Sequence, residues 1–226
     1  MTRKLLDCIE ITTAEQCEYS VIWLHGLGAS GHDFEPIVPE LHLLQRPGIR
    51  FLFPHAPVRP ISVNGGAAMR AWYDISSIDF EEREQDGDGI RDSAGAVADL
   101  IAHEIERGVP ASRITLAGFS QGGAMALYAG LAGEHRLGGI LALSCYLPLQ
   151  SDVLPRLGDA GTADVPVFMA HGSADEVVQL RFGEQSRAVL EASGVPVEWH
   201  TYPISHSISG DEVSDISAWL KRQFGM

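Results

Sequence analysis

One serine stands in the sequence setting that a covalent hydrolase needs. Positions 118–122 read Gly-Phe-Ser-Gln-Gly, with Ser120 at the centre. Residues 114–117 have the apolar character of a buried strand, and the small residues after position 122 are typical of a closely packed helix. A Gly-x-Ser-x-Gly motif between a strand and a helix predicts a nucleophile elbow, whose strained turn presents the serine hydroxyl. The alternative is an ordinary serine in a glycine-rich turn.

A serine hydroxyl becomes a good nucleophile only when a base takes its proton and an acid orients that base. On parallel sheets with this elbow, the partners follow the serine in the order acid, then histidine, at the carboxyl ends of strands. Asp175 follows the apolar run 167–170, and His206 follows the run 197–203. Order and placement therefore predict Ser120, Asp175 and His206 as the catalytic residues.

Other acids and histidines are less well placed. Glu176 is the one serious competitor for the acid, and Asp175 is favoured because it closes a short polar turn. His200 lies inside an alternating strand pattern, and His171 precedes the acidic loop. Asp164 comes before its strand, which would place it at the opposite edge of the sheet.

The sequence also predicts donors for the oxyanion of a tetrahedral intermediate. Residues 25–28, His-Gly-Leu-Gly, follow an apolar strand, and a glycine-rich loop can point backbone N–H groups outward. The expected donors are the N–H of Leu27 and the N–H of Gln121, the residue after the nucleophile. His25 is expected to hold the bend by hydrogen bonds.

A long stretch near position 60 is expected to form a wall beside the site. Residues 55–70 contain two prolines, a Gly-Gly pair and several apolar residues and are predicted to be irregular but ordered. Met69 and Trp72 are the candidate substrate-contacting residues. Trp72 fits equally well as an aromatic residue of the core.

Composition excludes several classes of function. The chain has 226 residues, 16 basic and 30 acidic side chains and a formal charge of −14, so nucleic acid and anionic membrane surfaces would repel it. No apolar run is long enough for a membrane span, residues 1–7 do not form a signal peptide, and we expect no stable membrane insertion. Cys8, Cys17 and Cys145 lack the spacing of a disulfide framework or zinc site, which favours a cytoplasmic protein. We expect no metal and no cofactor, because metal-ligand spacings, dinucleotide fingerprints and P-loops are absent from the sequence.

Strand and helix patterns alternate along the chain. They predict an α/β fold with a mostly parallel central sheet, helices on both faces, and one domain over 1–226. Only residues 145–166 separate two late strands, which is too short for a cap domain and predicts an open cleft suited to short or medium acyl chains. The expected strands are 6–12, 19–24, 49–54, 113–117, 137–144, 166–172 and 197–203, and the expected helices are 34–44, 90–107, 121–132, 177–193 and 211–224.

These motifs together resemble the small carboxylesterase and acyl-protein thioesterase (phospholipase/carboxylesterase) family of α/β-hydrolases. The resemblance implies the α/β-hydrolase fold, the triad Ser120, Asp175 and His206, and an oxyanion hole from Leu27 and Gln121. It also implies hydrolysis of esters or thioesters, and often homodimers. The motifs that carry it are His-Gly-Leu-Gly at 25–28, Pro-His-Ala-Pro-Val-Arg-Pro at 54–60, Trp-Tyr-Asp at 72–74, Gly-Phe-Ser-Gln-Gly-Gly at 118–123, His-Gly-Ser-Ala-Asp at 171–175 and His-Ser at 206–207.

Three functions compete at this stage. The first is a serine hydrolase that cleaves small ester or acylated substrates through an acyl-enzyme. The second keeps the triad but cleaves amides, as a peptidase or amidase. The third is a non-enzymatic binding protein on a hydrolase scaffold, which is disfavoured because all three triad members are present.

Overall fold

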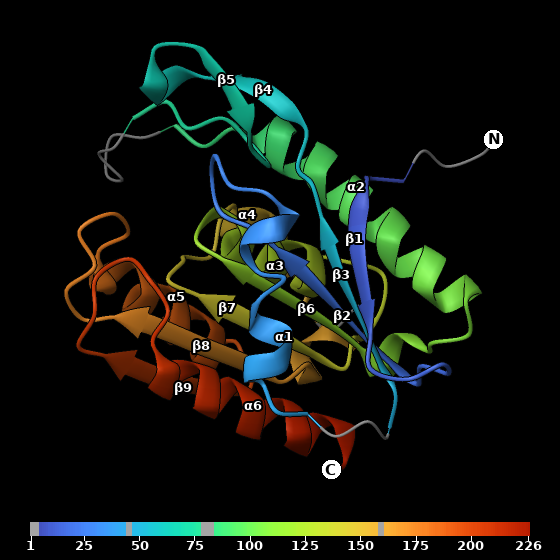
Figure 1. The fold of residues 1–226 in the computed structure, drawn as a ribbon. Helices are drawn as coiled ribbons and strands as arrows, with labels where there is room; N and C mark the ends of the chain where they lie inside the picture. Colours follow the sequence, from blue (N-terminus) through green and yellow to red (C-terminus); the bar gives the residue numbers. More distant parts are fainter. Residues whose placement is uncertain (1–4, 44–46, 78–83, 158–160) are drawn as a thin grey trace.

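A computed structural model describes residues 5–43, 47–77, 84–157 and 161–226. Seven strands form the central sheet in the order β1-β3-β2-β6-β7-β8-β9, and all neighbours are parallel except the antiparallel pair β1 and β3 (Figure 1). The mostly parallel sheet predicted from the sequence is therefore confirmed. Its strands are β1 (Cys8–Thr12), β2 (Tyr19–Leu24), β3 (Ile49–Pro54), β6 (Ile114–Phe119), β7 (Gly139–Leu143), β8 (Val167–Gly172) and β9 (Val197–Tyr202).

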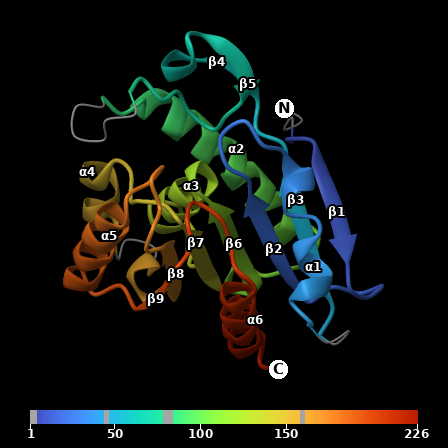
Figure 2. The same cartoon turned by 60° about the vertical axis from the view of Figure 1, so that its left-hand side comes forward.

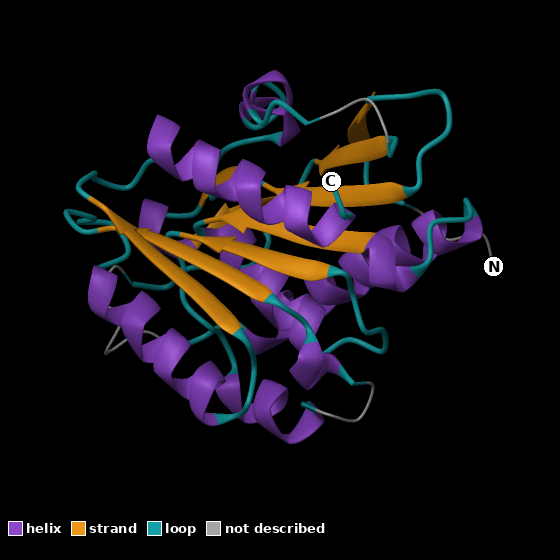
Figure 3. Cartoon of the chain, turned by 90° about the horizontal axis from the view of Figure 1, so that it is seen from below, coloured by secondary structure: helices purple, strands orange, loops and turns teal. Residues whose placement is uncertain are grey.

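Helices cover both faces of this sheet, as expected (Figure 3). The reason is visible in β2, where successive side chains point to opposite faces. Ile22 and Leu24 pack in the layer with α2, α3 and α5, whereas Val21 and Trp23 pack with α1 and α6. The helices are α1 (Ile37–Glu40), α2 (Gly87–Glu106), α3 (Gln121–Leu131), α4 (Gln150–Val153), α5 (Leu180–Ala192) and α6 (Gly210–Phe224), and the 3-10 turns are η1 (Gly31–Asp33), η2 (Ser62–Asn64), η3 (Ala111–Arg113), η4 (Leu154–Arg156) and η5 (Thr162–Asp164).

The helix expected over residues 34–44 is much shorter in the structure. Only Gly31–Asp33 and Ile37–Glu40 are helical, and position 44 lies outside the described residues. Pro39 lacks the N–H that would continue the helical ladder. His42, with a φ of 46°, then turns the chain out of helical geometry.

Residues 55–70, which were expected to be irregular, contain a β-hairpin. Strand β4 (Val58–Ile61) pairs antiparallel with β5 (Ala67–Arg70), and the hairpin projects beyond the central sheet (Figure 2). The turn closes through Gly65 and Gly66, whose φ values are 65° and 81°. Such angles suit glycine, so the Asn-Gly-Gly sequence was a hairpin signal.

Another expected loop is only partly described. Residues 80–83 of the acidic stretch 80–89 lie outside the described residues. The remainder leads into α2, which begins at Gly87, earlier than expected. The Asp86 side chain caps this helix by accepting a hydrogen bond of 2.9 Å from the Gly89 N–H.

The segment between β7 and β8 bears on access to the sheet edge. In its described residues it forms only α4, of 4 residues, and the short turns η4 and η5. The expectation of a fold without a cap domain is confirmed. Across the described ranges, no helix combines the length and apolarity required to span a bilayer.

Glu212 has a buried carboxyl group, and its surroundings shift the pKa of this group. Its side chain, on the first turn of α6, is 0% exposed, and neither carboxylate oxygen has a hydrogen-bond partner among the described residues. Burial raises the pKa of Glu212 to about 7, and repulsion from Asp215 adds to the rise. The nearby backbone N–H of Ser209 lowers the pKa and offsets part of this rise, although it does not form a hydrogen bond with either carboxylate oxygen.

Replacing this acid by its neutral isostere should change how stability depends on pH. The folded pKa of about 7 exceeds the ordinary value of 4.5, so the folded state binds more protons between these pH values. The contribution of Glu212 to stability is therefore greatest below the lower value and decreases as pH rises to the upper one. Glu212→Gln should remove this fall, gaining up to about 3 kcal/mol above pH 7 and little at low pH.

Urea unfolding at several pH values measures the effect. Asp211→Asn is the matched control, because Asp211 lies on the same helical turn with an exposed side chain. An equal pH dependence for Glu212→Gln and the native protein would contradict the prediction.

Candidate active site

Ser120 lies at a sharp turn between β6 and α3. Its φ of 56° and ψ of −120° are strained for a residue with a side chain, and the residue is half-buried. The turn is possible only because its neighbours are glycines. A Cβ at Gly118 would lie 2.2 Å from the Gly122 oxygen, and a Cβ at Gly122 would lie 2.2 Å from the Leu24 oxygen. The serine is therefore held in the geometry of a nucleophile elbow.

The loops after β8 and β9 bring the predicted acid and base together. Asp175 Oδ2 lies 2.6 Å from His206 Nδ1. The other carboxylate oxygen, Oδ1, accepts hydrogen bonds of 2.9 and 2.8 Å from the Val177 and Val178 N–H groups. Because Nδ1 donates to the carboxylate, Nε2 of the neutral imidazole is the acceptor and can receive a serine proton.

The base also lies next to the elbow. The His206 ring is 4.7 Å, centroid to centroid, from the ring of Phe119, the residue before Ser120. Among the described residues, no hydrogen bond joins the Ser120 hydroxyl to His206. Catalytic hydrogen bonds of this kind often tighten only when substrate binds.

The competing acid occupies a different environment. Asp175 is 6% exposed, whereas the Glu176 side chain faces solvent. A buried, fully hydrogen-bonded carboxylate can fix the ring of His206, and an exposed one cannot. The geometry favours Asp175.

His25 fixes the loop that carries the proposed Leu27 donor. Its Nε2 accepts a hydrogen bond of 3.0 Å from the Ala56 N–H, so the proton of the neutral ring is on Nδ1 and is donated to the Gly26 oxygen at 2.7 Å. Burial lowers the pKa of His25, which keeps the ring neutral. The residue holds the bend, as its position in the sequence suggested.

Two backbone amides remain available near the serine. Within the described ranges, the hydrogen bonds of the protein leave the N–H groups of Leu27 and Gln121 free. The loop is close to the nucleophile, because a Cβ at Gly26 would lie 3.5 Å from Ser120 Cβ. Gln121 is the first residue of α3, whose N-terminal end favours developing negative charge.

Comparison with known proteins identifies the family. A profile of the family Phospholipase/Carboxylesterase matches residues 6–223. The chain belongs to this family. It is a hydrolase with the α/β-hydrolase fold.

Relatives within the phospholipase/carboxylesterase family are similar over most of their length. Acyl-protein thioesterase 1 of Yarrowia lipolytica is 40% identical over 206 residues, which cover 89% of this chain and 90% of the relative. Acyl-protein thioesterase 1 of Neurospora crassa is 41% identical over 210 residues, which cover 89% of this chain and 85% of the relative. The crystal structure of Arabidopsis thaliana SOBER1 aligns with a TM-score of 0.85 at 31% identity, covering 91% and 98% of the two chains. Zea mays acyl-protein thioesterase 2 aligns with a TM-score of 0.85 at 27% identity, covering 97% and 99%.

The β4–β5 hairpin lies against the loop that carries Leu27. The Gly28 N–H donates to the Arg70 oxygen at 2.8 Å, which holds β5 against the loop of Leu27. Met69 lies at this junction, because a Cβ at Gly28 would be 3.6 Å from its sulfur. Trp72, in contrast, is 0% exposed, and its indole N–H donates to the His25 oxygen at 2.8 Å. Of the two interpretations of Trp72, the structure supports the core aromatic.

His171, which the sequence analysis set aside as a rival base, is a second histidine next to the acid, and its structural role was not predicted. It is 1% exposed, and its Nε2 lies 2.7 Å from the Val178 oxygen and 3.5 Å from Asp175 Oδ2. Burial lowers the pKa of His171. The ring therefore holds the acid loop through the Val178 oxygen and lies near the same carboxylate oxygen that binds His206. Its place at a strand end, in a His-Gly pair like that of His25, was the available signal.

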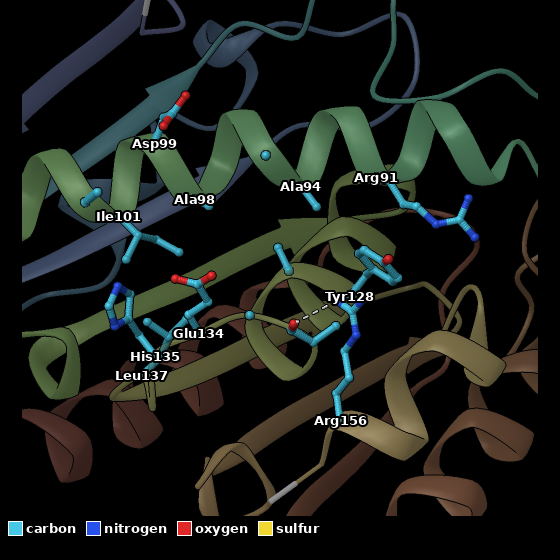
Figure 4. Close-up of a pocket in the computed structure, with 15 residues that line it drawn as sticks. Arg91, Ala94, Ala98, Asp99, Ile101, Tyr128, Glu134, His135, Leu137 and Arg156 are labelled. Carbon is cyan, nitrogen blue, oxygen red and sulfur yellow. Dashed lines mark hydrogen bonds between the residues drawn. The ribbon is translucent and has the colours of Figure 1, made fainter. Parts of the chain in front are cut away.

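A prominent pocket lies away from this chemistry. It has a volume of about 520 Å³ and lies between α2 and the C-terminal half of α3, at the opposite end of that helix from Ser120 (Figure 4). Its lining includes Tyr128, Arg91 and Arg156 but no predicted site residue. The described residues also contain no group of three metal-ligating side chains that could hold an ion. The candidate active site is the group of residues around Ser120.

The identity of the acid can be tested with two isosteric variants. In Asp175→Asn, the amide oxygen can keep the hydrogen bonds from the Val177 and Val178 N–H groups, so the amide N–H₂ must face His206 Nδ1. Nδ1 then has to accept a hydrogen bond, which places the proton of the neutral ring on Nε2 and prevents Nε2 from acting as the base. We expect kcat to fall by about 10⁴-fold with the fold intact. Glu176→Gln, an exposed control, should cost far less. Steady-state kinetics with circular dichroism measures both, and the reverse order of losses would identify Glu176 as the acid.

Proposed function

We propose that this chain is a serine hydrolase that cleaves carboxylic esters and acyl-thioesters through an acyl-enzyme. The observation that carries the proposal is the 2.6 Å hydrogen bond between buried Asp175 and His206, beside a strained Ser120. Ser120 is the nucleophile, His206 the general base and Asp175 its orienting acid. The relatives named acyl-protein thioesterase support the thioester part of the proposal.

The proposed reaction has two halves. Ser120 Oγ attacks the acyl carbonyl while His206 Nε2 takes its proton, and the oxyanion is bound by the Leu27 and Gln121 N–H groups. The C–O or C–S bond then breaks, His206 protonates the departing alcohol or thiol, and the acyl group stays on Ser120. A water molecule, activated by His206, attacks this ester in the same way and releases the carboxylic acid.

The substrate follows from the surroundings of the site. The short α4, η4 and η5 leave the leaving-group side uncovered in the described residues, and Met69 supplies an apolar surface beside the oxyanion loop. We therefore propose substrates with a short or medium acyl chain and a leaving group of any bulk, including an acylated protein.

The cellular setting is also part of the proposal. All three cysteines are free, and burial raises the pKa of the Cys145 thiol well above its usual range, so this thiol is unreactive. Free thiols and the charge of −14 support a reducing cytoplasm, with no nucleic-acid partner. A homodimer is proposed from the family resemblance alone.

The nucleophile can be tested directly. An organophosphonate should form a covalent adduct at Ser120, identified by mass spectrometry of the labelled peptide. Ser120→Ala should form no adduct and lose at least about 10³-fold in kcat, because triad members act as a unit. Ser173→Ala, an exposed serine on the acid loop, is the control. Most of the activity surviving in Ser120→Ala would exclude this mechanism.

The open site makes a prediction about acyl-chain length. Each methylene buried against the wall contributes about 0.8 kcal/mol, until the chain extends beyond the wall. Activity on a series of aryl esters should therefore rise from acetyl to medium chains and then fall. Because no cap must open, activity should follow substrate concentration smoothly through the micellar threshold. A sharp increase at that threshold would contradict the open-site interpretation.

A further inference from the structure

The two proposed oxyanion donors belong to different segments of the chain. Leu27 follows β2, and Gln121 begins α3 after β6. The sheet aligns β2 with β6 only as far as the pair Leu24 and Gly118. Beyond that pair both segments leave the ladder, so other contacts must set the separation of the two N–H groups.

The first such contact is made by the side chain of Gln121. It is 3% exposed, and its Oε1 accepts a hydrogen bond of 2.8 Å from the Trp72 N–H. Its Nε2 donates to the Tyr73 oxygen at 2.7 Å. The carboxamide therefore joins the start of α3 to the backbone of residues 72–73, and both of its polar atoms are used.

The second contact is made by the side chain of Trp72. Its indole N–H donates to the His25 oxygen at 2.8 Å, and the two rings lie 5.4 Å apart. Its carbonyl accepts a hydrogen bond from the Ser93 hydroxyl of α2, which fixes the residue at a second point. These hydrogen bonds and the complete burial of its side chain hold Trp72 in one position.

His25 completes the connection. Its ring binds the Gly26 oxygen and the Ala56 N–H, which immobilises the peptide before Leu27. A continuous hydrogen-bonded path thus runs from Gln121 through Trp72 to His25, and we call it the oxyanion bridge. Each of its three residues is at most 3% exposed, so water cannot substitute for its bonds.

We infer that Trp72 and the side chain of Gln121 are positioning residues that set the distance between the two oxyanion donors. The inference rests on the proposed function, because it assumes that the Leu27 and Gln121 N–H groups bind an oxyanion. Neither side chain needs to touch substrate. Their effect should appear in the tetrahedral transition state, where donors displaced by about 1 Å can cost on the order of 100-fold in rate.

The chain offers a matched pair of variants for the test. Trp72→Phe removes the indole N–H from the bridge. Trp23→Phe removes the same atoms from a tryptophan that is also 0% exposed, but whose Nε1 has no partner among the described residues. Both variants lose a similar packed volume, so the difference between them reports the hydrogen bond to His25.

The expected result is a loss of kcat with little change in KM. Trp72→Phe should lose roughly 10- to 100-fold in kcat/KM relative to Trp23→Phe on an aryl ester. A trifluoromethyl ketone, which forms a tetrahedral oxyanion on serine, should bind more weakly by the same factor. A residue that acts only on stability would lower the melting temperature without weakening this inhibitor selectively. Equal kinetics for the two variants, or unchanged inhibitor affinity in Trp72→Phe, would overturn the inference.

The other end of the bridge gives an independent test. Gln121→Met keeps the backbone donor but removes both side-chain hydrogen bonds, and it should reproduce the signature of Trp72→Phe. In the native protein, the indole N–H resonance of Trp72 should shift when the ketone adduct forms, because its acceptor belongs to the oxyanion loop, and that of Trp23 should not. The inference would be contradicted if the Trp72 indole resonance did not shift in the ketone adduct, or if Gln121→Met kept the kinetics of the native protein. Activity retained in Ser120→Ala would instead defeat the proposed function, so the two failures are distinguishable.

Discussion

The strained backbone at Ser120 is the constraint on which the rest of the structure depends. A conformation of this kind costs about 1–3 kcal/mol and persists only when its surroundings determine it. Here the Ser120 N–H donates a hydrogen bond of 2.8 Å to the Leu143 carbonyl oxygen, and the Ser120 carbonyl oxygen accepts one of 3.0 Å from the Ala124 N–H. All 11 residues of α3 are buried. The burial of this helix against β6 and β7 offsets the local cost, so the packed core maintains the strained elbow.

The parallel sheet then brings the remaining groups to the same edge. Loops after β2, β8 and β9 carry Leu27, Asp175 and His206 to the end of the sheet where the elbow lies. The acid and base loops pack unusually close. A Cβ at Gly172 would lie 2.4 Å from the Ser205 oxygen, next to His206. Glycine at this position therefore allows the short hydrogen bond of the acid to the base, although it contributes no chemical group.

Much of the fold and of the arrangement of the candidate site could be predicted because the signals are local or ordered along the chain. The apolar strands, the elbow and the order of Ser120, Asp175 and His206 are all properties of sequence position. The role of Trp72 stayed open, because burial of a single aromatic depends on distant partners, here His25 and Gln121. The structural role of His171 was not predicted, because it depends on contacts with Val178 and Asp175 that only the folded loop creates. The short helix at Ile37–Glu40 and the hairpin at Val58–Arg70 were predictable in principle, from Pro39 and from the Asn-Gly-Gly turn, since both signals are local.

The hairpin is joined to the rest of the molecule in a way that bears on how such proteins diversify. Its base is fixed, because Arg70 Nη1 donates to the Ala56 oxygen and the Arg70 oxygen accepts the Gly28 N–H. Beyond the turn the space is open, since a Cβ at Gly65 or Gly66 would meet nothing within 4 Å, although the positive φ of both residues favours glycine there. Residues inserted at this turn over evolutionary time can therefore extend into open space without disturbing the core or the elbow.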